Sequence, residues 1–173
     1  MKKVLYILGS FDDADAEWFV QAGRTIEVPD GRAIIKEGEP IDSLYFVTAG
    51  TFLVTTGPAK TEVARLGTGE VIGEVSFIDD RPPTATVTAL HDGRVLAVPR
   101  PLLAEKLSTD PRFASRFYRA IATFLASRLR GTLKQLGGTS SEIDLSELDL
   151  DELHSFSQAG VRFERILRRL QEV

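Results

Sequence analysis

The residues with the clearest chemical pattern in this chain lie between positions 73 and 87. Gly73 and Glu74 open the run Val75-Ser76-Phe77-Ile78, and this pattern predicts a short helix that begins at the glycine. The first N–H groups of a helix have no partner within it and carry the positive end of its dipole, so they favour an anion. We therefore expect this segment to bind an anionic ligand rather than to make or break covalent bonds.

A proline loop and a strand are predicted to follow this helix. Arg81, Pro82 and Pro83 form the loop, and residues 84–90 alternate threonine with apolar side chains at first. One face of such a strand offers hydroxyl groups, while the other face packs into a core. The sequence therefore predicts a binding site made from one helix start, one loop and one strand.

The run from Gly73 to Ile78, followed by Ala85-Thr86-Val87, resembles the signature of the cyclic nucleotide-binding domain family. The resemblance extends over residues 26–136 and implies a β-roll that binds cAMP or cGMP. In that family the glutamate accepts a hydrogen bond from the ribose 2′-hydroxyl, an arginine late in the segment pairs with the cyclic phosphate, and the next residue helps to select the base. The first role is thereby implied for Glu74 and the third for Thr84. The implied ligand site consists of Gly73, Glu74, Val75, Ser76, Arg81, Pro83, Thr84 and Ala85.

The position of the phosphate arginine is occupied by Pro83, which has neither a charge nor an N–H donor. Arg81 lies two residues earlier and would face the same way in an extended loop. Because an arginine–phosphate pair demands defined geometry, two alternatives stay open: Arg81 reaches the phosphate, or it is solvated. Structural alternatives also stay open for Glu74, which would complement the helix dipole, and for Thr84, whose β-branched side chain favours a strand.

The composition predicts a single binding module. The 173 residues are 43% hydrophobic and 27% charged, which suits one core with an appended helical segment. A net charge of −4 disfavours a nucleic-acid partner, and the absence of cysteine excludes disulfides and thiolate metal sites. No run approaches the roughly 18 apolar residues of a membrane span, so we expect a cytoplasmic chain.

The chain should fold as a mainly β protein with flanking helices, in an antiparallel β-roll or jelly-roll barrel. An acidic first turn and a glycine stop predict an N-terminal helix over residues 12–22. Short runs rich in β-branched and aromatic residues, separated by Gly, Pro or Asp, predict the strands. The predicted strands cover residues 25–28, 33–36, 43–48, 51–55, 62–66, 84–90 and 95–98.

Two helices are predicted after the last strand, one over residues 101–107 and a long one from Asp110-Pro111 to Leu136. Apolar side chains recur along the long helix at steps of three and four residues, which places them on one face. They are Phe113, Phe117, Ile121, Phe124, Leu125, Leu129, Leu133 and Leu136. Such a face packs on the roll, closes over a nucleotide or pairs with a second copy, and the family resemblance implies the last two uses.

The basic residues of the long helix fit its solvated back better than a DNA-binding surface. They are Arg112, Arg116, Arg119, Arg128, Arg130 and Lys134. We interpret residues 1–136 as the nucleotide-binding-like domain with its helix, residues 137–145 as a linker and residues 146–173 as a helical extension. The extension has an acidic and a basic segment, which could pair with each other, with a second subunit or with an effector protein.

Few residues are candidates for catalysis. The two histidines, His91 and His154, belong to no recognisable triad or metal-ligand spacing, so we expect no enzyme, no metal and no cofactor. We predict a regulatory module that binds a cyclic nucleotide or a related anion and signals through its long helix, as a homodimer or with an effector protein. The alternative is a degenerate module that binds no ligand and serves as a dimerisation or protein-interaction scaffold.

Overall fold

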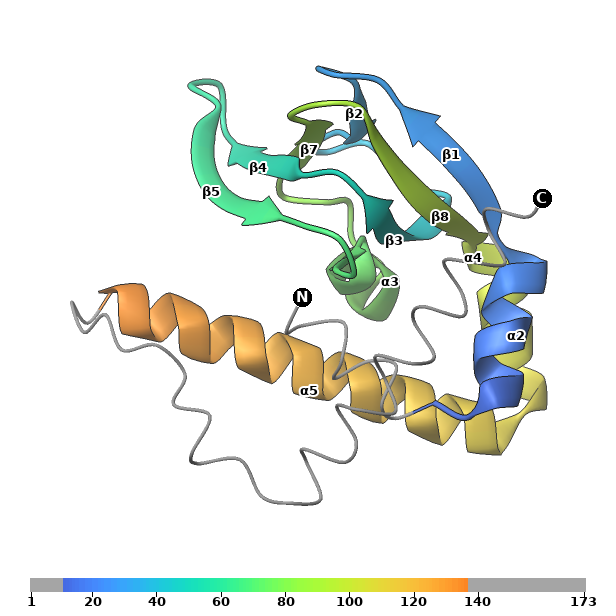
Figure 1. Ribbon diagram of the computed structural model, residues 1–173. Helices are drawn as coiled ribbons and strands as arrows, with labels where there is room; N and C mark the ends of the chain where they lie inside the picture. The colour runs from blue at the N-terminus through green and yellow to red at the C-terminus, as the bar shows by residue number, and fades with distance from the viewer. Residues whose placement is uncertain (1–10, 137–173) are drawn as a thin grey trace, which may run out of the picture.

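The computed structural model describes residues 11–136 and shows a roll of antiparallel strands flanked by helices (Figure 1). The strands are β1 (Arg24–Val28), β2 (Ala33–Ile35), β3 (Ser43–Ala49), β4 (Phe52–Thr56), β5 (Thr61–Leu66), β6 (Val71–Ile72), β7 (Thr86–Ala89) and β8 (Gly93–Pro99). The helices are α2 (Asp13–Ala22), α3 (Glu74–Asp79), α4 (Arg100–Thr109) and α5 (Pro111–Leu136). The predicted linker and helical extension lie outside the described residues.

The strands form two four-stranded sheets, with orders β1-β8-β3-β6 and β2-β7-β4-β5. Their pairing is antiparallel throughout the described residues. In Figure 1, α3 lies between the sheets and α5, while α2 and α4 gather at one end of α5. The predicted jelly-roll architecture with an N-terminal helix, a short helix after Gly73 and a long C-terminal helix is therefore confirmed.

Two details of the strand prediction are wrong. The two-residue strand β6 was not predicted, because Val71 and Ile72 are too few to show a strand pattern. The strand predicted from Thr84 begins only at Thr86. The preceding backbone groups are used in loop contacts: the carbonyl of Pro83 accepts from the Gly38 N–H at 2.8 Å, and that of Thr84 accepts from the Thr56 hydroxyl at 3.0 Å.

Two apolar clusters form the core. One lies between the sheets and includes Val28, Ile35, Val47, Phe52, Val87 and Val95. The other packs the helices on the outer face of the β1-β8-β3-β6 sheet and includes Phe19, Leu44, Leu96, Leu103, Phe113, Phe117, Ile121 and Phe124. The first half of the α5 apolar face therefore packs on the domain itself.

An ion pair fastens the start of α5 to α2. The Arg116 guanidinium donates to both carboxylate oxygens of Asp15, at 2.5 and 2.8 Å, and the Asp15 side chain is only 4% exposed. The placement of Arg116 on the solvated back of the helix was thus wrong, because its guanidinium turns to the buried Asp15 of α2. None of the helices within residues 11–136 is long and apolar enough to cross a membrane.

Candidate ligand-binding site

A cavity of about 510 Å³ lies between α3, the β2-β7-β4-β5 sheet and α5. All eight residues of the predicted site line it: Gly73, Glu74, Val75, Ser76, Arg81, Pro83, Thr84 and Ala85. Apolar side chains from the strands complete one wall, namely Ile35, Val54, Leu66, Ile72 and Val87. The structure therefore brings the predicted residues together around one space, which they share with Arg128 of α5.

Gly73 is required by the turn that leads from β6 into α3. Its φ of +92° lies in the left-handed region, and a Cβ atom at this position would come within 2.8 Å of Ile41 Cδ1. The turn is closed by the Gly73 carbonyl, which accepts from the Phe77 N–H at 3.1 Å. This geometry places Glu74 at the first position of α3, facing inward.

Glu74 is the most deeply buried acidic side chain of the cavity, at 2% exposed. Its Oε1 accepts from Nη1 of Arg128 in a close ion pair. The same guanidinium donates from Nη2 to the Val71 carbonyl at 3.3 Å and lies 4.4 Å from the centre of the Phe124 ring. Three separate contacts therefore direct Arg128 into the cavity, and its assignment to the solvated face of the helix was wrong.

Burial raises the pKa of the Glu74 carboxyl above its ordinary value. Arg128 opposes this shift by favouring the charged form, as do the nearby backbone N–H groups of Gly73 and Glu74, whereas the neighbouring Glu70 adds to the rise. Burial outweighs the opposing charge, because the carboxyl has almost no contact with water. In either protonation state the Glu74 carboxyl keeps oxygen lone pairs that can accept a hydrogen bond from a ligand in the cavity.

The phosphate side of the predicted site is arranged differently. Arg81 is exposed at the cavity mouth, and its backbone N–H donates to Asp79 Oδ1 at 3.1 Å. Within residues 11–136, its guanidinium forms no hydrogen bond or ion pair. Pro83 is partly buried and contributes only apolar surface and a carbonyl that already accepts from Gly38. Thr84 is exposed beside it.

Arg128 is the functional candidate that the sequence interpretation missed, although the pattern held a signal for it. It follows the buried side chains Phe117, Ile121 and Phe124 at steps of four, three and four residues. It therefore continues the apolar face of α5 rather than the polar one. A charged residue on a buried helical face needs a partner, and Glu74 is that partner here.

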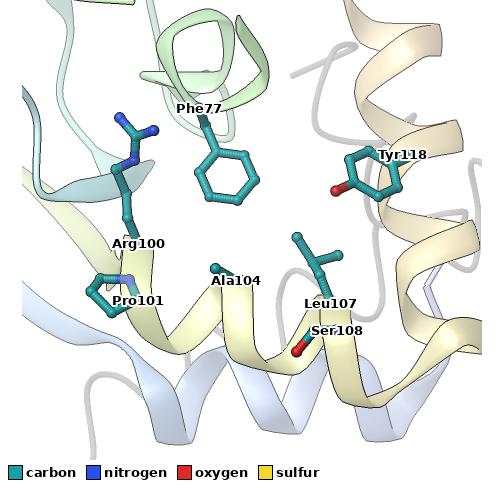
Figure 2. A pocket seen from close by; sticks show the side chains of 7 residues that line it. All are labelled: Phe77, Arg100, Pro101, Ala104, Leu107, Ser108 and Tyr118. Atoms are coloured by element: carbon teal, nitrogen blue, oxygen red, sulfur yellow. The ribbon is translucent and has the colours of Figure 1, made fainter. Parts of the chain in front are cut away.

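A second groove of about 470 Å³ lies between α3, α4 and α5 (Figure 2). In Figure 2, Arg100 and Phe77 stand on one side of it and Tyr118 on the other. The Arg100 guanidinium lies 5.5 Å from the Phe77 ring centre and donates to Asp80 Oδ1 at 2.9 Å. The residues that line this groove include no carboxylate. It therefore lacks the buried charge pair that distinguishes the first cavity.

Candidate metal ligands are not clustered in the described part of the chain, where no group of three or more His, Cys, Asp or Glu side chains could hold an ion. His91 is exposed, and His154 lies outside the described residues. Within residues 11–136, the main candidates for ligand contacts are therefore Glu74 and Arg128 rather than a metal site.

The family model of the cyclic nucleotide-binding domain matches residues 25–110. The crystallised N-terminal domain of a transcriptional regulator from Streptomyces coelicolor A3(2) is 32% identical, over 82% of this chain and 98% of that domain, with a TM-score of 0.60. A cyclic nucleotide-binding domain from Methylobacillus flagellatus KT shares the fold, with a TM-score of 0.69 at 23% identity over 83% of this chain and 86% of that one.

Curated relatives are longer proteins. An uncharacterized NTE family protein of Mycobacterium tuberculosis is 31% identical over 119 residues, which cover 69% of this chain and 20% of that protein. A CRP-like cAMP-activated global transcriptional regulator of the same species is 28% identical over 114 residues, which cover 64% of this chain and 49% of that protein. The chain thus spans a fifth to a half of the length of these relatives.

Proposed function

Because the chain belongs to the cyclic nucleotide-binding domain family, we propose that its cavity binds a cyclic nucleotide or a related small anion and that α5 signals the occupancy. The observation that carries this proposal is the inward-facing Glu74, buried in a cavity that also contains an arginine of α5. A buried carboxylate accepts a ribose hydroxyl well, since little water competes for it. The module is regulatory rather than catalytic.

The cavity also suits the size and polarity of such a ligand. Its volume of about 510 Å³ falls within the roughly 300–1,000 Å³ of small-molecule sites. Apolar side chains such as Val54 and Leu66 offer surface for a purine ring. Glu74 and Thr84 offer polar contacts for the sugar and for the exocyclic groups of the base. The CRP-like relative, which is cAMP-activated by its name, makes cAMP the first ligand to test.

Signalling requires that the ligand bind one placement of α5 more tightly than another. The cavity meets this requirement because Arg128 belongs to α5 and pairs with the carboxylate that the ligand would use. A ligand that occupies Glu74 competes with the arginine and changes how the helix is held. The effector that would sense this change is a second copy of the chain or another protein.

The test is a calorimetric titration of the full chain with cAMP and with cGMP. We expect saturable heat for one of them, and an affinity about 10- to 100-fold weaker for Glu74→Gln, since a charged hydrogen-bond acceptor is lost. Glu105→Gln, an exposed change on α4, is the matched control and should bind like the wild type. The proposal is contradicted if millimolar ligand produces no heat and no shift in melting temperature.

A second candidate function, a dimerisation scaffold, is favoured by the far face of α5. Leu129 and Leu133 are 61% and 58% exposed, and the helical repeat turns them away from the buried Phe117 and Phe124. The prediction that these residues share one apolar face is therefore wrong for the second half of α5. A second copy of the chain would cover this face and form a homodimer. Light scattering should then give twice the chain mass of 19.0 kDa, and a monomer at high micromolar concentration would exclude this function.

A further inference from the structure

Two guanidinium groups line the cavity, those of Arg81 and Arg128. A cyclic nucleotide carries one negative charge on its phosphate, and a site that excludes water must offset this charge with a cation or several donors. Pro83 provides neither. The residue that binds the phosphate is therefore whichever of the two arginines is placed to reach it.

Arg81 is poorly placed for this role. Its side chain is exposed, and the following residues hold it at the rim: Pro82 and Pro83 fix two φ angles, and the Pro83 carbonyl is tied to Gly38 by a hydrogen bond of 2.8 Å. An arginine in water is screened and pays an entropic cost when it is ordered. Contact with a phosphate inside the cavity would require this restrained loop to rebuild.

Arg128, in contrast, already lies in the wall of the cavity. Its side chain is 28% exposed, and its guanidinium is directed by Glu74, by the Val71 carbonyl at 3.3 Å and by the Phe124 ring at 4.4 Å. A positive charge that is partly removed from water interacts more strongly with an anion than an exposed one. The planar guanidinium also matches the geometry of phosphate oxygens.

The ion pair and the ligand are chemically matched. Glu74 accepts from Arg128, and it would accept equally from a ribose hydroxyl. Arg128 donates to a carboxylate, and it would donate equally to a phosphate. A ligand that carries a hydroxyl close to a phosphate can therefore take up both partners when it separates them, so that neither buried charge is left unpaired.

Resting on the proposed function, we infer that Arg128 of α5, rather than any residue of the 73–87 segment, binds the phosphate of the ligand. The charge that the segment lacks at Pro83 is supplied by the helix. Ligand binding then exchanges a Glu74–Arg128 contact for a Glu74–hydroxyl and an Arg128–phosphate contact. The second half of α5 becomes part of the site, so occupancy and helix position are coupled through a single side chain.

The experiment compares Arg128→Met, Arg81→Met and Arg130→Met in the full chain, titrated with whichever of cAMP and cGMP binds the wild type. Arg130 is exposed two residues beyond Arg128 on the same helix and serves as the matched control. We expect Arg128→Met to weaken binding about 10- to 100-fold, as for loss of a charged hydrogen-bond partner. The Arg81→Met and Arg130→Met variants should stay within about threefold of the wild type, as expected for exposed charges.

A second measurement separates phosphate binding from a structural role. The ³¹P resonance of the bound nucleotide should shift in Arg128→Lys, which keeps the charge and the ion pair with Glu74, and should stay in place in Arg81→Lys. The double variant Glu74→Gln/Arg128→Met, which leaves no unpaired buried charge, should still bind more weakly than Glu74→Gln alone.

Four results would overturn the inference. If Arg81→Met loses binding while Arg128→Met retains it, Arg81 holds the phosphate. If Arg128→Met binds more tightly than the wild type, the arginine only competes with the ligand for Glu74. If the wild type binds neither nucleotide, the proposed function itself fails, and the role of Arg128 fails with it. A wild type that binds while the variants behave alike contradicts only the inference.

Discussion

The two halves of α5 use the same kind of contact in different surroundings. In the first half, Arg116 pairs with the buried Asp15, and in the second half, Arg128 pairs with the buried Glu74. Asp15 also accepts from the Asp12 N–H at 3.0 Å in the capping box of α2, and neither Asp15 nor Arg116 lines the two cavities described above. Glu74 lies in the wall of a cavity. One pair joins α2 to α5 away from both cavities, and the other lies in the wall of a cavity that a ligand can enter.

Apolar packing follows the same division. Phe113, Phe117, Ile121 and Phe124 are at most 2% exposed, whereas Leu129 and Leu133 are more than half exposed. We therefore expect the first half to stay on the domain whether or not a ligand is present. In the second half, Leu125 still packs against the helix cluster and Arg128 pairs with Glu74. We therefore expect a change at Glu74 to alter the position of this half. Under the proposed function, we expect the first half of α5 to act as an anchor and the second half to respond to the ligand.

The largest expected effect tests the anchor. Phe117→Ala removes a side chain that is 1% exposed and contacts Phe113 and Phe77, with ring centres 6.2 and 5.8 Å away. We expect the free energy of unfolding to fall by about 3–5 kcal/mol, whereas Leu129→Ala in the second half should change it by less than about 0.5 kcal/mol. Urea denaturation measures both values. Equal losses would remove the distinction between the halves.

The next effect concerns the ion pair between Arg116 and Asp15. Arg116→Met leaves Asp15 buried without its bidentate partner, and we expect a loss of about 3 kcal/mol in unfolding free energy, at the lower end for broken buried pairs because Arg116 is partly exposed. Arg112→Met, an exposed change one turn earlier, is the control. Ligand affinity should be unchanged in any folded Arg116→Met protein, and a specific loss of affinity would show that this pair also serves the site.

A smaller expected effect is the pH dependence of stability that comes from Glu74, which pairs with Arg128 in the cavity. Because the folded pKa of Glu74 is raised above 4.5, its protonated form is favoured in the folded state. The stability that protonated Glu74 contributes is fully present below its ordinary pKa and is lost as pH rises through the raised folded pKa. Melting curves from pH 4 upward should therefore show the wild type losing stability relative to Glu74→Gln. A difference that stays constant with pH would mean that Glu74 titrates normally.

The smallest expected effect is on the far face of the second half. Leu129→Ser with Leu133→Ser replaces exposed side chains, so each should change the unfolding free energy of the monomer by no more than about 0.5 kcal/mol. If a second copy covers this face, the same changes should shift the protein from dimer to monomer in light scattering. A dimer that survives both changes must use another surface.

Local sequence patterns were sufficient to predict much of the fold. The run of apolar and aromatic residues in β3 and the spacing of Phe113, Phe117, Ile121 and Phe124 reflect burial within one element, which a sequence reveals directly. The late start of β7 was missed, because it depends on hydrogen bonds from Gly38 and Thr56, which are distant in sequence. The strand propensity of Thr84 is a local property, so it does not reveal loop hydrogen bonds to distant residues.

The sequence predicted the site residues of the 73–87 segment but not the arginine that α5 contributes. Gly73 and Glu74 belong to a contiguous segment with a readable pattern, and the residues of that segment do line one cavity. Arg116 and Arg128 were misassigned because a long arginine side chain is usually solvated, and their buried partners lie 101 and 54 residues away. Contacts of that range are set by how α5 crosses the roll, which local periodicity does not determine.

Hydrogen exchange along α5, with and without saturating cyclic nucleotide, tests the central claim most directly. The account predicts that exchange changes in residues 125–136, where Arg128 joins the helix to the site, and stays the same in residues 113–124, which are anchored by the aromatic cluster and by Arg116. Unchanged exchange throughout the helix at millimolar nucleotide, or an equal change in both halves, would contradict it.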